Sequence, residues 1–233
     1  MNVIVTGASS GIGYEMVKQF VLDSRVNRVF AIARRKERLT KLFEECGSDK
    51  LTIKSFDLQS GDYQVLLSNE FFKECESIDV LINNAGLLIN KPFEELSIED
   101  FRASYEVNVF GPVRLIQSVL PKLKASKSSH VVNISSMGGF QGSAKFAGLS
   151  AYSSSKSALA CFSECLAEEL KDENIKVNCL ALGAVQTEML ESAFPGYKAP
   201  LSSAEMAAYI AEFGLSAHEI YNGKVIPVSL STP

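Results

Sequence analysis

The stretch Thr6-Gly7-Ala8-Ser9-Ser10-Gly11-Ile12-Gly13 decides the fold of this chain. It follows a short apolar run at residues 3–5 and precedes an amphipathic pattern at residues 11–22, so it joins a strand to a helix. Its glycines allow a tight turn and a close approach of the backbone to a pyrophosphate, which the helix N-terminus attracts. The turn therefore predicts dinucleotide binding, with a purely structural turn as the alternative. Its spacing, GxxxGxG, departs from the commoner GxGxxG.

Outward from this turn, short apolar runs alternate with longer helical patterns. Strands are predicted at residues 3–5, 28–32, 51–56, 78–82, 130–135, 175–181 and 224–228, and helices at residues 11–22, 36–46, 63–75, 98–123, 151–171 and 203–213. This alternation implies an α/β fold: one Rossmann-type doubly wound parallel sheet of about seven strands with helices on both faces. We expect residues 1–233 to form a single domain, with a substrate loop or lid at roughly residues 186–203.

Composition narrows the class of protein. The chain has 233 residues, of which 46% are hydrophobic, and a formal net charge of −4, which disfavours a nucleic-acid partner. No apolar run is long enough for a membrane span, and the chain begins directly with the first strand, without a signal-peptide pattern. We therefore expect a cytoplasmic protein that does not bind membranes. Its five cysteines form no CxxC pair, so we expect reduced thiols and no metal site.

Further motifs follow the turn in order along the chain. Asn83-Asn84-Ala85-Gly86 follows the fourth predicted strand, Asn108 lies within a predicted helix, Asn133-Ile134-Ser135-Ser136 ends the fifth strand, and Tyr152-Ser153-Ser154-Ser155-Lys156 lies in the next helix. Together with the glycine turn, these motifs resemble the short-chain dehydrogenase/reductase family over nearly the whole chain. The resemblance implies a nicotinamide-dependent oxidoreductase that acts on a small-molecule ketone, aldehyde or secondary alcohol.

Tyr152 and Lys156 are four residues apart, so they share one face of a helix. An ammonium group near a phenol favours the phenolate and lowers the tyrosine pKa from about 10, which suits proton exchange with a carbonyl or alcohol. An ordinary exposed pair is the alternative. The resemblance implies that Tyr152 is the general acid/base and that Ser136, rather than Ser135, hydrogen-bonds the substrate oxygen. It also implies that Asn108 interrupts its helix and holds a water linked to Lys156.

The second predicted strand ends in Ala33-Arg34-Arg35, where an NAD-preferring site usually carries an acid. Arginine suits a 2′-phosphate, so NADP(H) is favoured over NAD(H), with Arg34 as the stronger candidate for the phosphate and Arg35 for covering the adenine. A solvated basic helix start is the alternative. With the contacts that the family resemblance implies, the predicted cofactor residues are Gly7, Ser9, Ser10, Gly11, Ile12, Gly13, Arg34, Arg35, Asp57, Leu58, Asn84, Ala85, Gly86, Tyr152, Lys156, Val185 and Thr187.

The predicted function is that of an NADP(H)-dependent carbonyl reductase or alcohol dehydrogenase. The alternatives are a non-catalytic NADP(H)-binding sensor or scaffold and, on the same fold, an enoyl reductase or epimerase. The residues Phe140, Phe146, Met189, Phe194 and Tyr197 suggest either an apolar substrate pocket or core packing. The resemblance also implies a homodimer or homotetramer joined through the helices that hold Asn108 and Tyr152, and Leu159, Phe162 and Leu166 suit such an interface or the core.

Overall fold

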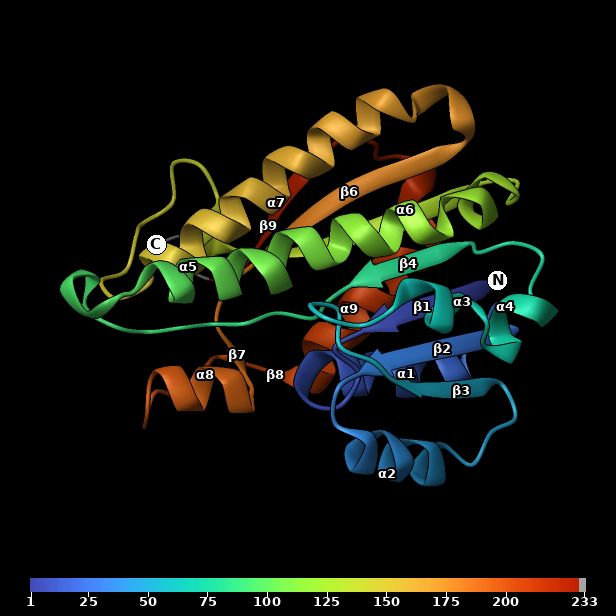
Figure 1. The fold of residues 1–233 in the computed structure, drawn as a ribbon, viewed down its shortest axis with the longest axis horizontal. Helices are drawn as coiled ribbons and strands as arrows, with labels where there is room; N and C mark the ends of the chain where they lie inside the picture. The colour runs from blue at the N-terminus through green and yellow to red at the C-terminus, as the bar shows by residue number, and fades with distance from the viewer. Residues whose placement is uncertain (231–233) are drawn as a thin grey trace.

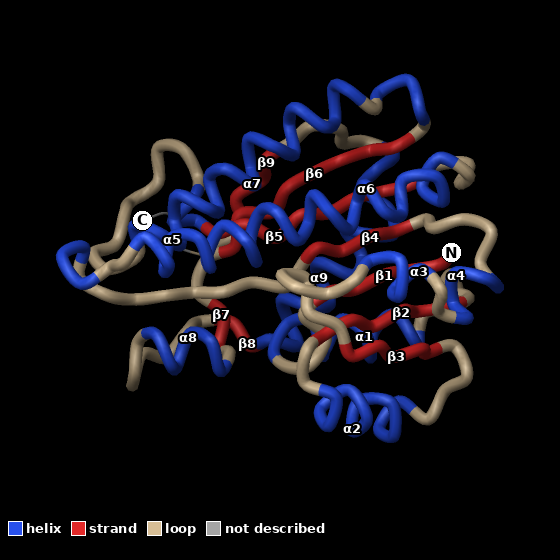
Figure 2. Tube along the Cα trace, viewed as in Figure 1, coloured by secondary structure: helices blue, strands red, loops and turns tan. Residues whose placement is uncertain are grey.

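The computed structural model describes residues 1–230, so the last three residues of the predicted domain lie outside the described part. Within it, seven parallel strands form one sheet in the order β3-β2-β1-β4-β5-β6-β9 (Figures 1 and 2). This order is that of a doubly wound sheet, which confirms the predicted Rossmann-type fold. The strands are β1 (Asn2–Thr6), β2 (Arg28–Ala33), β3 (Leu51–Ser55), β4 (Val80–Asn83), β5 (Ser129–Ser136), β6 (Ile175–Leu182) and β9 (Val225–Val228).

Helices cover both faces of the sheet because its central strands are apolar on both sides. In β1, Val3 and Val5 pack in one hydrophobic cluster and Ile4 packs in the other. The first cluster takes in α1 (Gly11–Leu22), α2 (Lys36–Cys46) and α9 (Ser203–Ser216). The second takes in α3 (Tyr63–Leu67), α4 (Glu70–Glu74), α6 (Gly111–Lys124) and α7 (Ser150–Glu169), with α6 and α7 lying across that face in Figure 1.

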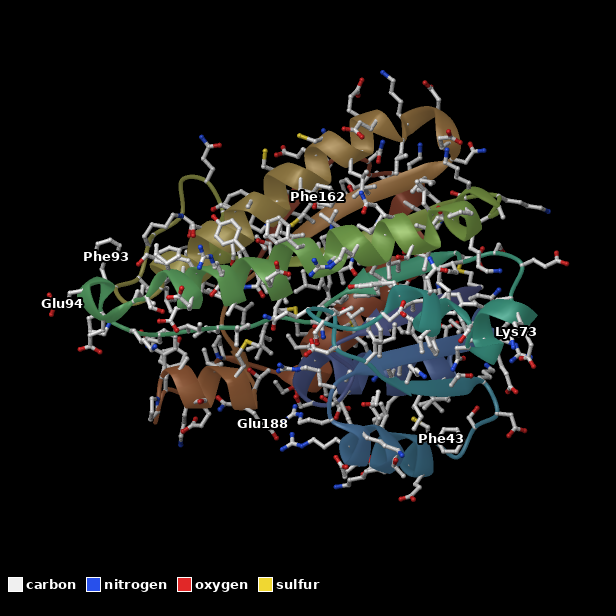
Figure 3. The ribbon with its side chains drawn as sticks, in the orientation of Figure 1. Phe43, Lys73, Phe93, Glu94, Phe162 and Glu188 are labelled. Carbon is white, nitrogen blue, oxygen red and sulfur yellow. The ribbon has the colours of Figure 1, made fainter. Side chains whose placement is uncertain are left out.

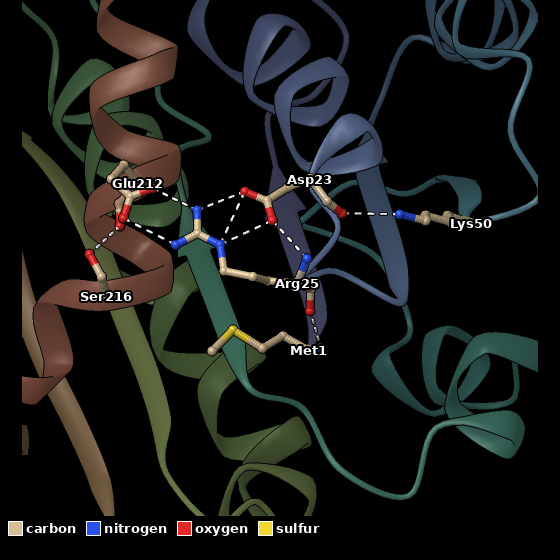
Figure 4. A network of polar contacts seen from close by, with 6 residues as sticks. All are labelled: Met1, Asp23, Arg25, Lys50, Glu212 and Ser216. Carbon is tan, nitrogen blue, oxygen red and sulfur yellow. Dashed lines mark hydrogen bonds and ion pairs between the residues drawn. The ribbon is translucent and has the colours of Figure 1, made fainter.

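An exposed ionic network links two helices of the first face. The guanidinium of Arg25 lies 2.7 Å from Asp23, which follows α1, and 2.6 Å from Glu212 of α9 (Figure 4). Lys50 donates to the backbone carbonyl of Asp23 at 3.0 Å. Because these charges are largely in water, they add little to stability, and the apolar contacts beneath them hold α1 against α9.

The predicted helix at residues 98–123 is interrupted. It is composed of α5 (Ile98–Tyr105), a π-helical turn (Glu106–Phe110) and α6. Pro112 has no N–H for the carbonyl four residues earlier, that of Asn108, and the helix widens there: Gly111 N–H donates to Glu106 O, five residues before it. Asn108 thus lies in a local break of its helix, as the family resemblance implied.

Two other predicted stretches differ from the structure. Residues 63–75 form two short helices rather than one, because the Asn69 side chain accepts from Phe71 N and begins α4. The stretch at residues 186–203 is not irregular throughout. It contains α8 (Glu188–Ala193), and β7 (Val185–Gln186) pairs in parallel with β8 (Leu201–Ser202). None of the helices within residues 1–230 is both long enough and apolar enough to cross a membrane.

Candidate active site

One elongated cavity of about 1190 Å³ lies at the carboxyl ends of the parallel strands, where doubly wound sheets place their ligands. Its wall extends from the glycine turn to the start of α7 and includes residues of α8. All of the predicted cofactor and catalytic residues line it except Gly13 and Asn108, which lie just behind its wall. The predicted residues in the wall are Gly7, Ser9, Ser10, Gly11, Ile12, Arg34, Arg35, Asp57, Leu58, Asn84, Ala85, Gly86, Ser136, Tyr152, Lys156, Val185 and Thr187.

The glycine turn is built by close approaches of backbone. Gly7 and Gly11 have φ angles of +71° and +57°, which side chains rarely permit. A Cβ on Gly7 would lie 2.8 Å from the Cα of Ala85, and one on Gly13 would lie 2.4 Å from the carbonyl oxygen of Gly7. Gly13 therefore brings α1 against the turn and does not face the cavity.

Thr6 fastens this turn to the Asn83–Gly86 segment, a role that the sequence analysis missed. Its buried hydroxyl accepts hydrogen bonds from the backbone N–H groups of Asn84 and Ala85, both at 3.0 Å. The Asn84 amide donates in return to Thr6 O, also at 3.0 Å. A polar residue at the end of an otherwise apolar strand was the available signal.

The two candidate arginines differ in their surroundings. Arg35 Nε donates to Ser9 Oγ at 3.2 Å, and its Nη2 donates to Ser10 Oγ at 2.6 Å. Arg34 follows the end of β2, where its backbone carbonyl accepts from Ser55 Oγ at 2.9 Å. Both line the cavity, but it is Arg35 that contacts the glycine turn. The assignment of Arg34 to the phosphate and Arg35 to the adenine stays a prediction.

Ser136, Tyr152 and Lys156 meet at the other end of the cavity. Ser136 ends β5, where its Oγ accepts from Gly138 N at 3.2 Å and lies near enough to the Tyr152 hydroxyl to influence its pKa. Lys156 Nζ lies 6.0 Å from the centre of the Tyr152 ring and donates to Ile134 O at 2.7 Å. The rival Ser135 donates instead to the backbone carbonyl of Lys156 at 2.8 Å, so its hydroxyl is used in attaching β5 to α7.

Burial is the largest influence on both titratable groups of this cluster. It lowers the pKa of Lys156 to about 8, because the ammonium is held away from water. It raises the pKa of Tyr152, and the hydrogen bond from Ser136 opposes that rise only in part. The expected lowering of the Tyr152 pKa is thus wrong for the protein by itself, since burial outweighs the contributions that favour the phenolate.

Asn108 supports the catalytic end from behind. Its Oδ1 accepts from Leu87 N at 2.8 Å, and its Nδ2 donates to Leu87 O and to Ser155 Oγ, both at 2.9 Å. A Cβ on Gly86 would lie 3.5 Å from both Asn108 Oδ1 and Lys156 Nζ. The Asn108 amide therefore connects the segment after Gly86 to α7, and both of its N–H groups have protein partners.

The far end of the cavity is mostly apolar. Four of the five predicted pocket residues line it, and Phe140 does not. Leu87 and Leu88, which were not predicted as pocket residues, lie in a loop after β4 that has no periodic pattern. The apolar side chains here are Leu87, Leu88, Met137, Phe146, Leu149, Met189, Leu190, Phe194 and Tyr197.

Comparisons with known proteins agree with this architecture. A family model described as short chain dehydrogenase matches residues 1–198. Retinol dehydrogenase 8 of Homo sapiens is 35% identical over 196 residues, which cover 80% of this chain and 60% of the relative. The chain therefore spans less than two thirds of that relative's length.

Solved structures give the same picture of the fold. The closed form of serine dehydrogenase complexed with NADP+ matches with a TM-score of 0.83 and 26% identity, covering 98% of this chain and 94% of that one. A 3-ketoacyl-(acyl-carrier-protein) reductase from Brucella melitensis, complexed with NADH, matches with a TM-score of 0.87 over 98% of this chain and 96% of its own. At 22% identity, the second likeness concerns the fold alone.

Proposed function

The chain belongs to the short-chain dehydrogenase/reductase family, and on that basis we propose that it is an NADP(H)-dependent oxidoreductase that interconverts a ketone or aldehyde and its alcohol. One observation carries the proposal: a single cavity joins the glycine turn and the arginines Arg34 and Arg35 to the cluster of Ser136, Tyr152 and Lys156. A binding protein without chemistry has no need for that buried cluster at the end of its nucleotide site.

The donors at the glycine turn support a nicotinamide dinucleotide. Backbone at Gly7 and Gly11, with the start of α1, would hold the pyrophosphate, and Asp57 and Leu58 would hold the adenine. Val185 and Thr187 would hold the nicotinamide carboxamide, and the bound cofactor would supply or accept the hydride. We favour the phosphorylated form because Ala33 stands where an acid would bind a ribose hydroxyl, beside two arginines.

The protein's own part in the reaction is to move a proton. Ser136 Oγ and the Tyr152 hydroxyl would bind the substrate oxygen together, and Tyr152 would donate its proton in reduction and accept one in oxidation. Below about pH 8 Lys156 is charged, and that charge stabilises the tyrosinate that reduction leaves behind. Asn108 would hold a water that links Lys156 to solvent. Because both N–H groups of its amide already have protein partners, this water would bind at another of its polar atoms.

We propose a neutral, largely apolar substrate. Among the described residues at the catalytic end, Lys156 is the only side chain that is charged at neutral pH, and the remaining walls are aliphatic or aromatic side chains with a few polar ones. A charged substituent would lose its hydration there without gaining a partner. The name of retinol dehydrogenase 8 agrees with a lipophilic alcohol. In a panel of ketones and aldehydes matched in size, kcat/KM should therefore fall on adding a carboxylate.

We also propose that the chain forms a homodimer or homotetramer through the face that carries α5, the π-helical turn and α7. Phe110 is 46% exposed and Ile98 is 62% exposed on this side, and both would be covered in such an interface. Light scattering after size exclusion gives the mass in solution directly. A monomer at micromolar concentration would contradict this part of the proposal.

The central experiment is a fluorescence titration with NADPH and NADH, followed by the carbonyl panel monitored at the nicotinamide absorbance. We expect tighter binding of NADPH and turnover of at least one apolar carbonyl compound. Tyr152→Phe should lower kcat at least about 100-fold and change cofactor affinity little, since it removes only the transferred proton. Tight binding with no turnover would favour the sensor alternative, and turnover unaffected by Tyr152→Phe would contradict the mechanism.

A further inference from the structure

Glu188, the first residue of α8, contacts two arginines that follow β2. Arg38 Nη1 lies 2.6 Å from both carboxylate oxygens of Glu188, and Arg35 Nη1 lies 3.4 Å from one of them. Figure 3 shows Glu188 between α8 and α2. These residues are 150 or more positions apart in sequence, so the contact joins the segment predicted as a substrate loop to the end of the cavity that carries the proposed adenosine contacts.

The same guanidinium also contacts the glycine turn. Arg35 donates to Ser9 Oγ and Ser10 Oγ while its remaining nitrogen faces Glu188. The guanidinium groups of Arg35 and Arg38 and the hydroxyls of Ser9 and Ser10 form a donor set that suits a phosphate. The Glu188 carboxylate is the anion that the two guanidinium groups contact. Side chains of Glu188 and Arg38 are 59% and 43% exposed, so a competing anion can reach this cluster from solvent.

The backbone next to Glu188 is held at the turn. The methyl group of Thr187 would lie 3.2 Å from a Cβ on Gly11, and the Thr187 hydroxyl accepts from Leu190 N to begin α8. One residue before, β7 pairs with β8. The contacts of Thr187 and the pairing of β7 with β8 therefore fix the start of α8, and with it the position of the Glu188 carboxylate beside the arginines.

We propose that Glu188 is a cofactor-selectivity residue, whose carboxylate occupies the arginine cluster that a cofactor 2′-phosphate needs and thereby weakens NADP(H) binding relative to NAD(H). This inference rests on the proposed function of the same cavity. A 2′-phosphate has to displace the carboxylate from Arg35, whereas a ribose 2′-hydroxyl leaves the ion pairs in place. Glu188 therefore narrows the preference for NADP(H) that the arginines create.

The test compares dissociation constants of NADPH and NADH for the intact protein, for Glu188→Gln and for the control Glu191→Gln. Glu191 lies on the same helix, is exposed, and bonds to Gly196 N rather than to an arginine. Glu188→Gln should tighten NADPH binding about fivefold, which corresponds to roughly 1 kcal/mol, and should leave NADH within twofold. The control should change neither constant, although it removes the same charge.

Calorimetry with 2′,5′-ADP and with 5′-AMP measures the contribution of the 2′-phosphate to binding. The two probes differ only in that group, and neither carries a nicotinamide. The Glu188→Gln gain should appear for 2′,5′-ADP alone and should shrink as salt is added, as expected for exposed charges. Equal tightening of both probes, no change, or weaker 2′,5′-ADP binding would each overturn the inference. An unmodified protein that binds neither cofactor would overturn the proposed function as well, so the two failures are distinguishable.

Discussion

At the scale of residues, the two serines that end β5 have different partners. Ser136 lies beside the Tyr152 hydroxyl in the cavity wall, whereas Ser135 donates to the backbone carbonyl of Lys156. We therefore predict that Ser136→Ala lowers kcat about 100-fold, as removal of a donor to a reacting oxygen does. Ser135→Ala should lower the free energy of unfolding by about 1 kcal/mol and change kcat only a few-fold. Steady-state kinetics and urea unfolding measure the two effects, and equal losses of kcat would contradict the assignment.

The pKa of Lys156 predicts a pH limit for reduction. With that pKa lowered to about 8, Lys156 is charged at pH 7 and becomes neutral as the pH rises through 8. Reduction leaves a tyrosinate at position 152, which the charged lysine stabilises, so kcat for ketone reduction should decline above about pH 8. Stopped-flow single turnovers across pH 6 to 10 check this, with Tyr152→Phe as the baseline. A profile flat to pH 10 would exclude Lys156 from this role.

Residue-scale predictions from sequence succeeded where a motif specifies its own geometry. The four-residue spacing of Tyr152 and Lys156 fixes a shared helix face, and the glycines of the first turn predicted the tight, closely packed backbone found at Gly7. The contact between Arg35 and Glu188 could not be predicted in this way. Glu188 lies on a distant element, and nothing in the local sequence of either residue specifies that they meet.

At the scale of elements, α1 depends on a glycine in its first turn. A Cβ on Gly13 would lie 2.4 Å from Gly7 O and 2.5 Å from Asn84 Nδ2, so Gly13→Ala should push the helix away from the turn. We predict a loss of about 1 to 3 kcal/mol in the free energy of unfolding, the usual cost of overpacking. Gly86→Ala is the control, because its Cβ would meet its neighbours at an ordinary 3.5 Å. If both variants unfold at the same urea concentration, the close approach of Gly13 to Gly7 and Asn84 does not explain why a glycine is needed at position 13.

Element boundaries were predictable where an apolar pattern determines them and failed where a side chain intervenes. The bounds of α1 and α2 match the prediction to the residue. The break at Asn69 depends on a side-chain cap, and the π-helical turn depends on Pro112, a single residue within an unbroken amphipathic pattern. The pairing of β7 with β8 involves only two residues on each side, too few for a periodic signal.

At the scale of the whole molecule, a buried histidine links three elements near the amino ends of the parallel strands, opposite the end of the sheet that carries the cavity. His130 of β5 bonds through Nδ1 to Gly214 O of α9 and through Nε2 to the Asn178 amide of β6. Those partners suit a neutral ring with the proton on Nδ1, and burial lowers the pKa of His130 from 6.5 to about 4. Protonation of His130 at low pH should therefore disturb the packing of these elements, at a place far from the active-site cavity.

We predict a loss of stability between pH 6.5 and pH 4. In that range the unfolded chain binds a proton at His130 that the folded chain does not, so the stabilisation is complete above pH 6.5 and decreases as the pH falls. The loss approaches about 3 kcal/mol near pH 4. Urea unfolding at several pH values should show a shallower dependence in His130→Gln, even if that variant is less stable at pH 7. Identical slopes would show that other groups govern acid unfolding.

The short pairing of β7 with β8 has a consequence for how this fold can diversify. It brings Gln186 and Ser202 together, so the segment between them begins and ends at one place on the scaffold. Because the entropy of closing a loop rises slowly with its length, that segment can be lengthened, shortened or exchanged at small cost. Residues 189–200, which follow the proposed cofactor-site residues Thr187 and Glu188, therefore form an interchangeable segment, and grafting a foreign segment there is a route to new substrate ranges on an unchanged sheet.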